Sequence, residues 1–374
     1  MRIWKAFATL LTILALILPA DITLAASSKD GKKNTAQSQT QTKKGSATAK
    51  QAKSGGAKQS TPAKSSDSKA KHGGKKSTRK EAKHSKAQAP ELKAPVKTIA
   101  QPDSNKGEFG VDTKAALVMD IETGHILFAQ EPDLTIPPAS LTKVLTLYIL
   151  NELIQSGSIK PEQVISVSQE ASHAGGSTMR LRTGEQVTLD ELMKGIAVAS
   201  ANDGCVAVAE YLGKGDTHPF VEAMNSKAKE IGMANSQFFN PNGLPADGQV
   251  TTARDMALLA QAYLKRFPQT LAVHSMTEFT HNNRVRHNSN SLLGKVEGVD
   301  GLKTGFVCAS GFNIVVTARR GDTRLVAVVL GAKNRRIRER EATRLIEEGF
   351  KIVAAQKQLE VKHVAMNPGA STPQ

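Results

Sequence analysis

A long basic stretch of low complexity limits where this chain can build a folded domain. Residues 27–100 are almost all Lys, Ser, Ala, Gly, Gln and Thr, with eighteen lysines and one arginine against four acids. The resulting net charge of this stretch is +15, and almost no aliphatic or aromatic side chain occurs between residues 27 and 91. Such a segment cannot bury enough apolar surface to offset the entropy of ordering, so we expect it to be disordered. The fold must therefore lie in residues 101–374, which carry no net charge.

The first residues have the features of a secretory signal. Arg2 and Lys5 precede an apolar core at 6–19, and a candidate cleavage site follows at 23–26. Asp21 interrupts the apolar stretch before it reaches the roughly 20 residues of a membrane-spanning helix. We expect cleavage and export to the periplasm or cell wall, with an uncleaved membrane anchor as the alternative.

Beyond the basic stretch the hydrophobic pattern alternates between strand-like and helix-like segments. Strands are predicted at 115–121, 126–129, 276–281, 301–306, 313–318 and 325–330. Helices are predicted at 140–155, 189–198, 203–212, 219–231, 252–266 and 334–351, with Asp203 as the expected N-cap of the third of them. The order of sheet, helical insert, sheet and helix is typical of an α+β fold with a mostly antiparallel sheet.

The composition divides the chain into four parts. We expect a signal peptide at 1–26, a disordered basic linker at 27–108, one catalytic domain at 109–356 and a short C-terminal tail at 357–374. The chain ends about two dozen residues after the last predicted helix, so no second domain is expected.

Three short motifs occur in order within the predicted domain: Ser140-Leu141-Thr142-Lys143, Ser200-Ala201-Asn202 and Lys303-Thr304-Gly305. Ser140 and Lys143 are three residues apart in a predicted helix, so both side chains project from the same face. An amine within reach of a serine hydroxyl is the arrangement of an activated nucleophile. The same spacing occurs in the basic stretch, but only Ser140 is followed by an apolar helical run that can hold a site.

The motif set resembles that of serine penicillin-binding proteins and class A β-lactamases. Within that superfamily, the flanking segments are similar to those of low-molecular-mass D-alanyl-D-alanine carboxypeptidases. The similar segments are Pro138 to Lys143, Ser200 to Asp203, Phe239 to Leu244 and Gly301 to Phe306. The resemblance covers residues 112–352 and implies a β-lactamase/transpeptidase-like α+β fold. Its five-stranded, mostly antiparallel sheet is flanked by helices and accompanied by an all-helical lobe.

Each motif residue has an expected role. Ser140 is the acyl-accepting nucleophile, and Lys143 is the base, which must be neutral to accept a proton. Burial and a second cation, Lys303, are expected to lower the pKa of Lys143. Ser200 would relay the proton to the leaving amine, and Asn202 would bind the peptide backbone of the substrate.

The third motif is expected to recognise the end of the substrate. Lys303 and Thr304 offer a cation and a hydroxyl to a terminal carboxylate, and Gly305 lets the substrate lie against the strand. The resemblance implies an oxyanion hole formed by the backbone N–H groups of Ser140 and Phe306. The segment at 240–243 is predicted to be a turn, and whether it also shapes the cleft is left open.

These residues together predict a serine D-Ala-D-Ala carboxypeptidase that removes the terminal D-Ala from peptidoglycan stem pentapeptides through an acyl-enzyme, with β-lactams as covalent inhibitors. A D,D-endopeptidase that cleaves peptidoglycan cross-links is the alternative. A β-lactamase is disfavoured because no segment between the second and third motifs matches the deacylating glutamate of class A. A catalytically degenerate envelope-binding protein is disfavoured because the set of Ser140, Lys143 and Lys303 is intact.

Other ligands are expected to be few. No H-E-x-x-H motif occurs and the cysteines lack metal-binding spacing, so neither a metal nor a cofactor is expected. Cys205 and Cys308 each follow a motif by three residues; we expect small buried side chains, with a disulfide as the alternative.

The basic linker is expected to contact anionic envelope polymers or lipids, or to act as a spacer. Nucleic acid is excluded as its partner by export and the lack of aromatic residues.

Overall fold

The computed structural model describes residues 110–366. The predicted signal peptide, the basic linker and the last eight residues lie outside this range, so the assignments made for them stay predictions. Each strand and helix predicted within the range overlaps an observed element.

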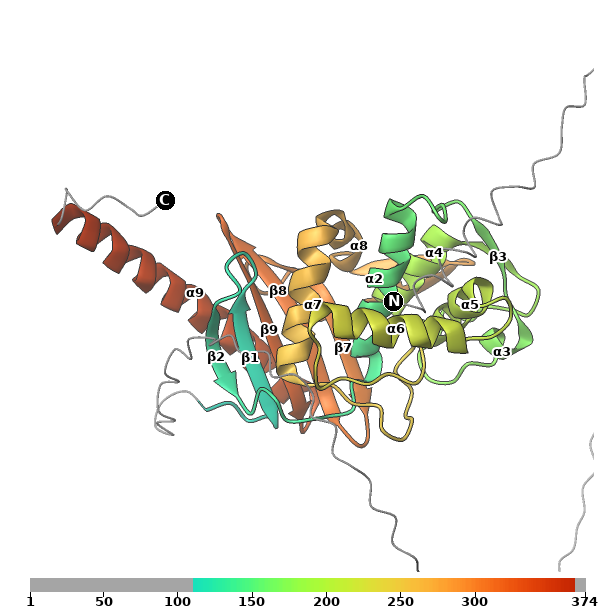
Figure 1. Cartoon of the computed structure of the whole chain (residues 1–374), viewed down its shortest axis with the longest axis horizontal. Helices are drawn as coiled ribbons and strands as arrows, with labels where there is room; N and C mark the ends of the chain where they lie inside the picture. Colours follow the sequence, from blue (N-terminus) through green and yellow to red (C-terminus); the bar gives the residue numbers. More distant parts are fainter. Residues whose placement is uncertain (1–109, 367–374) are drawn as a thin grey trace, which may run out of the picture. The chain divides into compact units, whose positions relative to one another are not determined.

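One five-stranded sheet forms the centre of the larger lobe, in the order β2-β1-β9-β8-β7 (Figure 1). Its strands are β1 (Ala115–Asp120), β2 (Ile126–Gln130), β7 (Val299–Val307), β8 (Gly311–Arg320) and β9 (Thr323–Ala332). Every neighbouring pair is antiparallel, which confirms the predicted fold class. Strand β7 lies at the edge, so part of its backbone faces away from β8 and is free to pair with a ligand.

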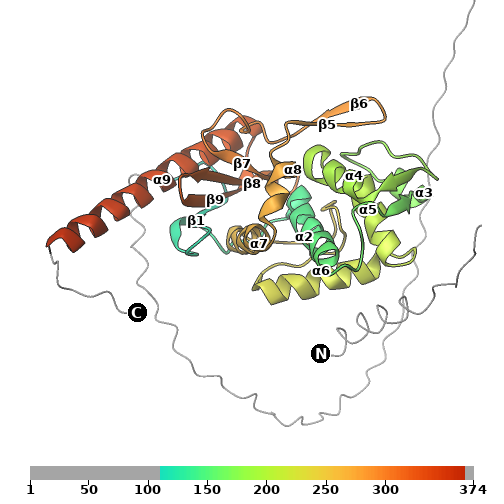
Figure 2. The ribbon, with the colours of Figure 1, turned by 90° about the horizontal axis from the view of Figure 1, so that it is seen from above.

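Helices cover both faces of the sheet. Helix α7 (Ala253–Arg266) packs on one face and α9 (Arg335–Met366) on the other (Figure 2). The alternation of side chains along a strand divides the core accordingly: Leu117 belongs to the cluster on the α7 side, and Val118 belongs to the cluster on the α9 side. Both clusters are buried, so the central strands are apolar on both faces.

The helical lobe is inserted between β2 and β7. It contains α3 (Gln169–Ser172), α4 (Leu189–Lys194), α5 (Asn202–Leu212) and α6 (His218–Ile231), with the short hairpin of β3 (Val164–Ser166) and β4 (Gln186–Thr188). A second hairpin, β5 (Glu278–His281) and β6 (Arg284–His287), lies beside the lobe, and α8 (Leu271–His274) packs on β7. The sequence analysis missed β3, β4, β6, α3 and α8, because segments of three or four residues show no reliable periodicity.

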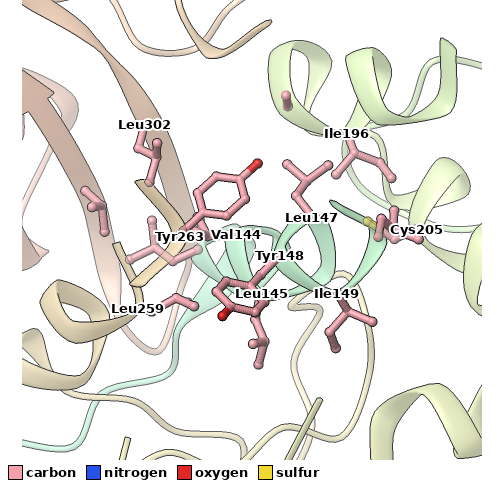
Figure 3. Close-up of a cluster of buried hydrophobic side chains, with 14 of the residues drawn as sticks. Val144, Leu145, Leu147, Tyr148, Ile149, Ile196, Cys205, Leu259, Tyr263 and Leu302 are labelled. Atoms are coloured by element: carbon pink, nitrogen blue, oxygen red, sulfur yellow. The ribbon is translucent and has the colours of Figure 1, made fainter. Parts of the chain in front are cut away.

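Helix α2 (Thr142–Gln155) joins the two lobes. Every residue from 142 to 151 is buried, because α7 packs against one side of the helix and the helical lobe against the other. In the core, Tyr263 and Leu302 lie on one side of α2, and Ile196 and Cys205 lie on the other (Figure 3). A helix that is buried on all sides is apolar around its whole circumference, and the lysine in its first turn is therefore an exception that requires a local cause.

The last helix is longer than predicted. The sequence analysis ended it at residue 351 and placed a separate tail from 357, but α9 continues to Met366 and projects beyond the sheet (Figure 1). No glycine or proline occurs between Gly349 and Pro368, and the intervening residues are mostly good helix formers. The prediction ended the helix with its amphipathic pattern, and Val353 is the last side chain of α9 that the structure describes as buried. Backbone propensity continues the helix beyond it. No helix within residues 110–366 combines the length and the apolar character needed to cross a membrane.

Candidate active site

The nucleophile candidate lies at the junction between the sheet and helix α2. Pro138 is followed by one 3-10 turn, η1 (Ala139–Leu141), which leads directly into α2. Ser140 is partly exposed on this turn, and Lys143 follows in the first turn of α2. Lys143 Nζ donates a hydrogen bond to Ser140 Oγ at 2.9 Å. The structure therefore brings together the serine and the amine of the first motif.

The amine of Lys143 is held in an almost dry environment. The residue is fully buried, and its Nζ also donates to the backbone carbonyl of Asn242. Burial lowers the pKa of Lys143 to about 8, while the negative charge of Asp203 acts in the opposite direction. The neighbouring Cys205 contributes no charge at neutral pH, because burial raises the pKa of its thiol to about 12. The neutral amine is therefore a minor but accessible form near neutral pH.

The second lysine lies close to the first. Lys303 is 3% exposed on β7, and its Nζ donates to the carbonyl of Thr304 at 3.1 Å. Its pKa is lowered to about 7, first by burial and then by the positive charges of Lys143 and Arg338. Burial is the main cause of the lowered pKa of each amine, and the expected repulsion between Lys143 and Lys303 adds to it.

The second motif forms the opposite wall of the cleft. Ser200 ends a single π-helical turn, η2 (Gly195–Ala199), with a left-handed φ of 59°, and Asn202 begins α5. The Asn202 backbone N–H donates to the Ser177 carbonyl at 2.7 Å, and its side-chain Nδ2 donates to the Gly175 carbonyl at 2.6 Å. Asn202 Oδ1 is buried without a hydrogen-bond partner among the described residues. An N–H group of a bound peptide would satisfy this acceptor.

Asp203 has a different place from the one predicted. The sequence analysis assigned it as the N-cap of the following helix, but Ala201 occupies that position and Asp203 lies inside α5. Its fully buried carboxylate accepts hydrogen bonds from the backbone N–H groups of Met179 and Leu181, at 3.1 and 3.0 Å. Asp203 therefore fixes the neighbouring loop instead of capping its own helix, because these distant donors are also buried and need an acceptor.

The turn at 240–243 is part of the site, which settles the question left open by the sequence. Its carbonyl groups face α2: the Asn242 carbonyl accepts from Lys143, and the Pro241 carbonyl accepts from Thr146 at 2.6 Å. Gly243 has a φ of 82° and lies against the carbonyl of Ala139. The turn thus supports both the Lys143 amine and the backbone that precedes Ser140.

The third motif lies on edge strand β7, beside the nucleophile. A Cβ on Gly305 would lie 3.1 Å from the backbone nitrogen of Ser140 and 3.2 Å from the carbonyl oxygen of Pro138. Glycine at this position therefore permits the close approach of β7 to η1. The next residue, Phe306, is half exposed, and its ring packs against Phe312 at a centroid distance of 4.4 Å.

A cleft of about 410 Å³ is lined by residues from all three motifs. It is lined by Ser140, Ser200, Asn202, Thr304, Gly305 and Phe306, together with Arg335 and Arg338 from the start of α9. Lys143 and Lys303 lie behind this wall instead of on its surface. None of the described residues that line the cleft is an aspartate or a glutamate.

The sequence analysis missed Arg338. This residue is 4% exposed and its Nε has no partner among the described residues, although another guanidinium nitrogen contacts Glu339 at 3.1 Å. A signal was present in the sequence, since Arg335, Arg336 and Arg338 occur at the N-terminus of a helix, where positive charges oppose the helix dipole. Positive side chains that destabilise the start of their own helix indicate that at least one of them has a role outside the helix.

The two cysteines are not paired. Cys205 is buried and Cys308 is exposed, and both thiols are free. The expectation of a small buried side chain is confirmed for Cys205 and is wrong for Cys308. Cys308 lies in the turn after β7, beyond the part of the strand that packs against the core.

Comparison with known proteins agrees with this geometry. The family model described as D-alanyl-D-alanine carboxypeptidase matches residues 97–334. The chain belongs to this family. All three motifs and the turn at 240–243 fall within the matched range.

Individual relatives share the catalytic region. The chain is 40% identical to the D-alanyl-D-alanine carboxypeptidase DacC of Escherichia coli, over 64% of this chain and 62% of that protein. It is 31% identical to a D-alanyl-D-alanine endopeptidase of Pseudomonas aeruginosa, over 62% of this chain and 75% of that protein. Among solved structures, penicillin-binding protein 6B of Escherichia coli matches with a TM-score of 0.62 and 36% identity, covering 66% of this chain and 78% of that one.

The contact between Gly243 and Ala139 can be tested by adding a methyl group. In Gly243→Ala the new Cβ would lie 1.9 Å from the Ala139 oxygen, and the alanine would have to adopt the left-handed φ that glycine has here. We therefore expect a loss of about 3 kcal/mol or more in the free energy of unfolding. Gly157→Ala is a matched control, since Gly157 has a φ of 74° but no neighbour within 4 Å; about 1 kcal/mol is expected. Urea denaturation measures both. Equal losses would show that the Ala139 carbonyl moves aside freely.

Proposed function

We propose that the protein is a serine D-Ala-D-Ala carboxypeptidase that removes the terminal D-Ala from peptidoglycan stem pentapeptides. The observation that carries this proposal is the 2.9 Å contact between Lys143 Nζ and Ser140 Oγ, with the amine buried and its pKa lowered to about 8. A serine beside a partly neutral amine can be deprotonated without any further group. Membership of the family and the shared motifs support the same reaction.

Acylation would use the groups already in place. Lys143 accepts the proton as Ser140 Oγ attacks the carbonyl carbon of the penultimate D-Ala. The backbone N–H groups of Ser140 and Phe306 are our candidates for stabilising the oxyanion, and the approach of Gly305 to the Ser140 nitrogen supports this choice. The C–N bond then breaks, and the departing D-Ala amine takes a proton, with Ser200 as the relay. Water finally hydrolyses the ester and regenerates Ser140.

The walls of the cleft suggest how the substrate is held. We assign the terminal carboxylate to the Thr304 hydroxyl and the Arg338 guanidinium, since both line the cleft and Arg338 Nε has no partner among the described residues. Lys303 would then add positive potential from behind the wall, where it is buried. Asn202 Oδ1 would accept an N–H from the peptide on the acyl side of the scissile bond.

The chemistry of the cleft favours a peptidase over a β-lactamase. No carboxylate lines it within the described residues, so no carboxylate base is positioned to take a proton from water and speed deacylation. β-Lactams are therefore expected to form a long-lived acyl-enzyme on Ser140. The fact that a structural relative is a penicillin-binding protein supports this expectation.

A D,D-endopeptidase that cleaves cross-links is the second candidate, because one relative at 31% identity carries that activity in its name. Both reactions use the same nucleophile and the same acyl group. They differ in the leaving group, which is a single D-Ala in one case and a whole second stem in the other. Products therefore distinguish them, whereas the catalytic residues do not.

We also propose that the enzyme works outside the cytoplasm, where its substrate lies, after removal of residues 1–26 and with residues 27–108 as a basic tether. N-terminal sequencing of the exported protein tests the cleavage. The charge of the tether predicts salt-sensitive retention on anionic vesicles, which a chain lacking residues 27–100 should lose. Equal retention of the two chains at low salt would favour a passive spacer.

Substitution of the nucleophile tests the main proposal. Ser140→Ala should lose covalent labelling by penicillin and all release of D-Ala, because no other serine among the described residues that line the cleft is hydrogen-bonded to a lysine amine. Mass spectrometry of pentapeptide and cross-linked muropeptides after incubation gives the products. Loss of only the terminal D-Ala is expected from the wild-type protein; cleavage of cross-links would favour the endopeptidase, and labelling of Ser140→Ala would refute the assignment.

The lowered pKa of Lys143 predicts a pH dependence of acylation. A general base acts only when it is unprotonated, so the rate of acylation by a fluorescent penicillin should rise with pH through about 8 and level off above it. Lys143→Arg, which keeps the charge but cannot become neutral, should be unreactive across the range. A rate that is flat between pH 6 and 9 would show that Lys143 is not the base.

A further inference from the structure

Two prolines leave the backbone before Ser140 with few hydrogen-bond donors of its own. Pro137 and Pro138 have no N–H group, so only their carbonyl groups can connect this part of the backbone to other elements. On one side, Ile136 forms both backbone hydrogen bonds of an antiparallel bridge with Thr251, at 2.8 and 2.9 Å. The next carbonyl, that of Pro137, needs a donor from a different part of the chain.

Asn313 on β8 provides this donor. Its side chain is fully buried, and Nδ2 donates to the Pro137 carbonyl at 3.3 Å and to Ser310 Oγ at 3.0 Å. Its Oδ1 accepts from the backbone N–H of Gly331 at 2.8 Å. The two ends of the amide cannot be exchanged, because the Gly331 N–H requires an acceptor and the Pro137 carbonyl requires a donor. The orientation of this side chain is therefore fixed.

An irregularity in the sheet directs the Asn313 side chain. The register of β8 against β9 shifts between Phe312 and Ile314, and Gly331 of β9 has a left-handed φ of 77°. At this point the Asn313 amide accepts a backbone N–H of β9 in addition to its contact with Pro137. Irregularities of this kind commonly occur beside active sites, where they redirect a side chain.

The same side chain lies beside the glycine of the third motif. Asn313 is the cross-strand partner of Gly305, and residues paired in this way project from the same face of a sheet. A Cβ on Gly305 would point at the Ser140 nitrogen and the Pro138 carbonyl, so this face of the sheet is the one that carries η1. Asn313 therefore connects the backbone before Ser140 to the strand that neighbours β7.

We infer that Asn313 is a positioning residue for the oxyanion hole. This inference rests on the proposed function, in which the hole consists of the N–H groups of Ser140 and Phe306. These two groups belong to separate elements, η1 and β7, so their spacing depends on what connects the elements. Asn313 is buried and is not among the described residues that line the cleft, so it acts without touching the substrate. Without its bond to Pro137, η1 is free to move away from β7 and the two donors separate.

A change in this spacing affects the transition state more than the bound substrate. The oxyanion exists only while the carbonyl carbon is tetrahedral, and its stabilisation requires both donors at hydrogen-bond distance. The intact peptide is instead assigned to Thr304, Arg338 and Asn202, which do not depend on the spacing of the two N–H groups. Loss of the Asn313 contact therefore lowers kcat and leaves KM almost unchanged.

Asn313→Asp in the full chain tests this inference, because it removes the donor to Pro137 and keeps the Oδ1 acceptor for Gly331. We expect kcat for D-Ala release and the rate of acylation by a fluorescent penicillin to fall about 10- to 100-fold, with KM within about twofold. Affinity for a peptide boronic acid, whose tetrahedral adduct with Ser140 places an oxygen in the hole, should fall by the same factor. Ser310→Ala is the matched control: it removes the other acceptor of Nδ2 and should keep wild-type rates.

The pH profile of acylation separates lost positioning from the charge that aspartate adds. A new carboxylate that acted on Lys143 would raise the pKa of the amine, as Asp203 does, and move the rise in rate to higher pH. Displacement of η1 instead lowers the plateau without moving the rise. Asn313→Ala adds no charge and should give the same lowered plateau, so it provides the test if the aspartate prevents folding.

The results also distinguish this inference from the proposed function. Wild-type kcat and boronic acid affinity in the Asn313 variants, or a loss explained entirely by a shifted pH profile, would overturn the inference and leave the proposed function standing. Acylation of the wild-type protein by penicillin without release of D-Ala would refute the proposed reaction. The acylation rates and boronic acid affinities of the variants would then decide the inference on their own.

Discussion

The burial of one amine at the start of helix α2 is the constraint on which the site depends. An ammonium group removed from water loses much of its solvation, and this loss makes the neutral, reactive form of Lys143 accessible. The cost is limited by two partners, the Ser140 hydroxyl and the Asn242 carbonyl, and by the buried charge of Asp203. A helix exposed on one side could not provide this environment, so the sandwiching of α2 between the two lobes is a requirement of the chemistry.

The surrounding backbone also keeps Ser140 within hydrogen-bond distance of Lys143. Ala139, directly before the nucleophile, has a left-handed φ of 51°, and Ser200 in the facing wall has one of 59°. Such conformations cost about 1 to 3 kcal/mol each and persist only where neighbouring groups enforce them. At Ala139 the enforcing groups are the Thr142 hydroxyl, which donates to its carbonyl, and Gly243, which packs against it. The turn at 240–243 therefore holds Ser140 and Lys143 in one arrangement.

The sequence was sufficient for whatever depends on local pattern or on motifs. It predicted the antiparallel sheet, the helical insert and the pairing of Ser140 with Lys143, because periodicity and i to i+3 spacing translate directly into geometry. It failed where the outcome depends on partners distant in the chain. Asp203 was predicted as a local cap, but its acceptor atoms serve Met179 and Leu181, and Lys303 lies behind the cleft because of how β7 packs. Arg338 was missed for the same reason, since only the folded sheet brings α9 to the cleft.

If the proposed reaction is correct, the composition of the cleft accounts for one base that serves peptides and is still blocked by β-lactams. With no carboxylate on the described walls, deacylation as well as acylation must draw on Lys143 and the groups around it. In the proposed reaction a peptide substrate would lose its D-Ala, which would vacate the space beside Thr304 and let water approach the ester. An opened β-lactam would keep its leaving amine attached, so the same space would stay filled and water would be excluded. The lifetime of the acyl-enzyme would thus be decided by what leaves the cleft, while the catalytic groups would be the same in both cases.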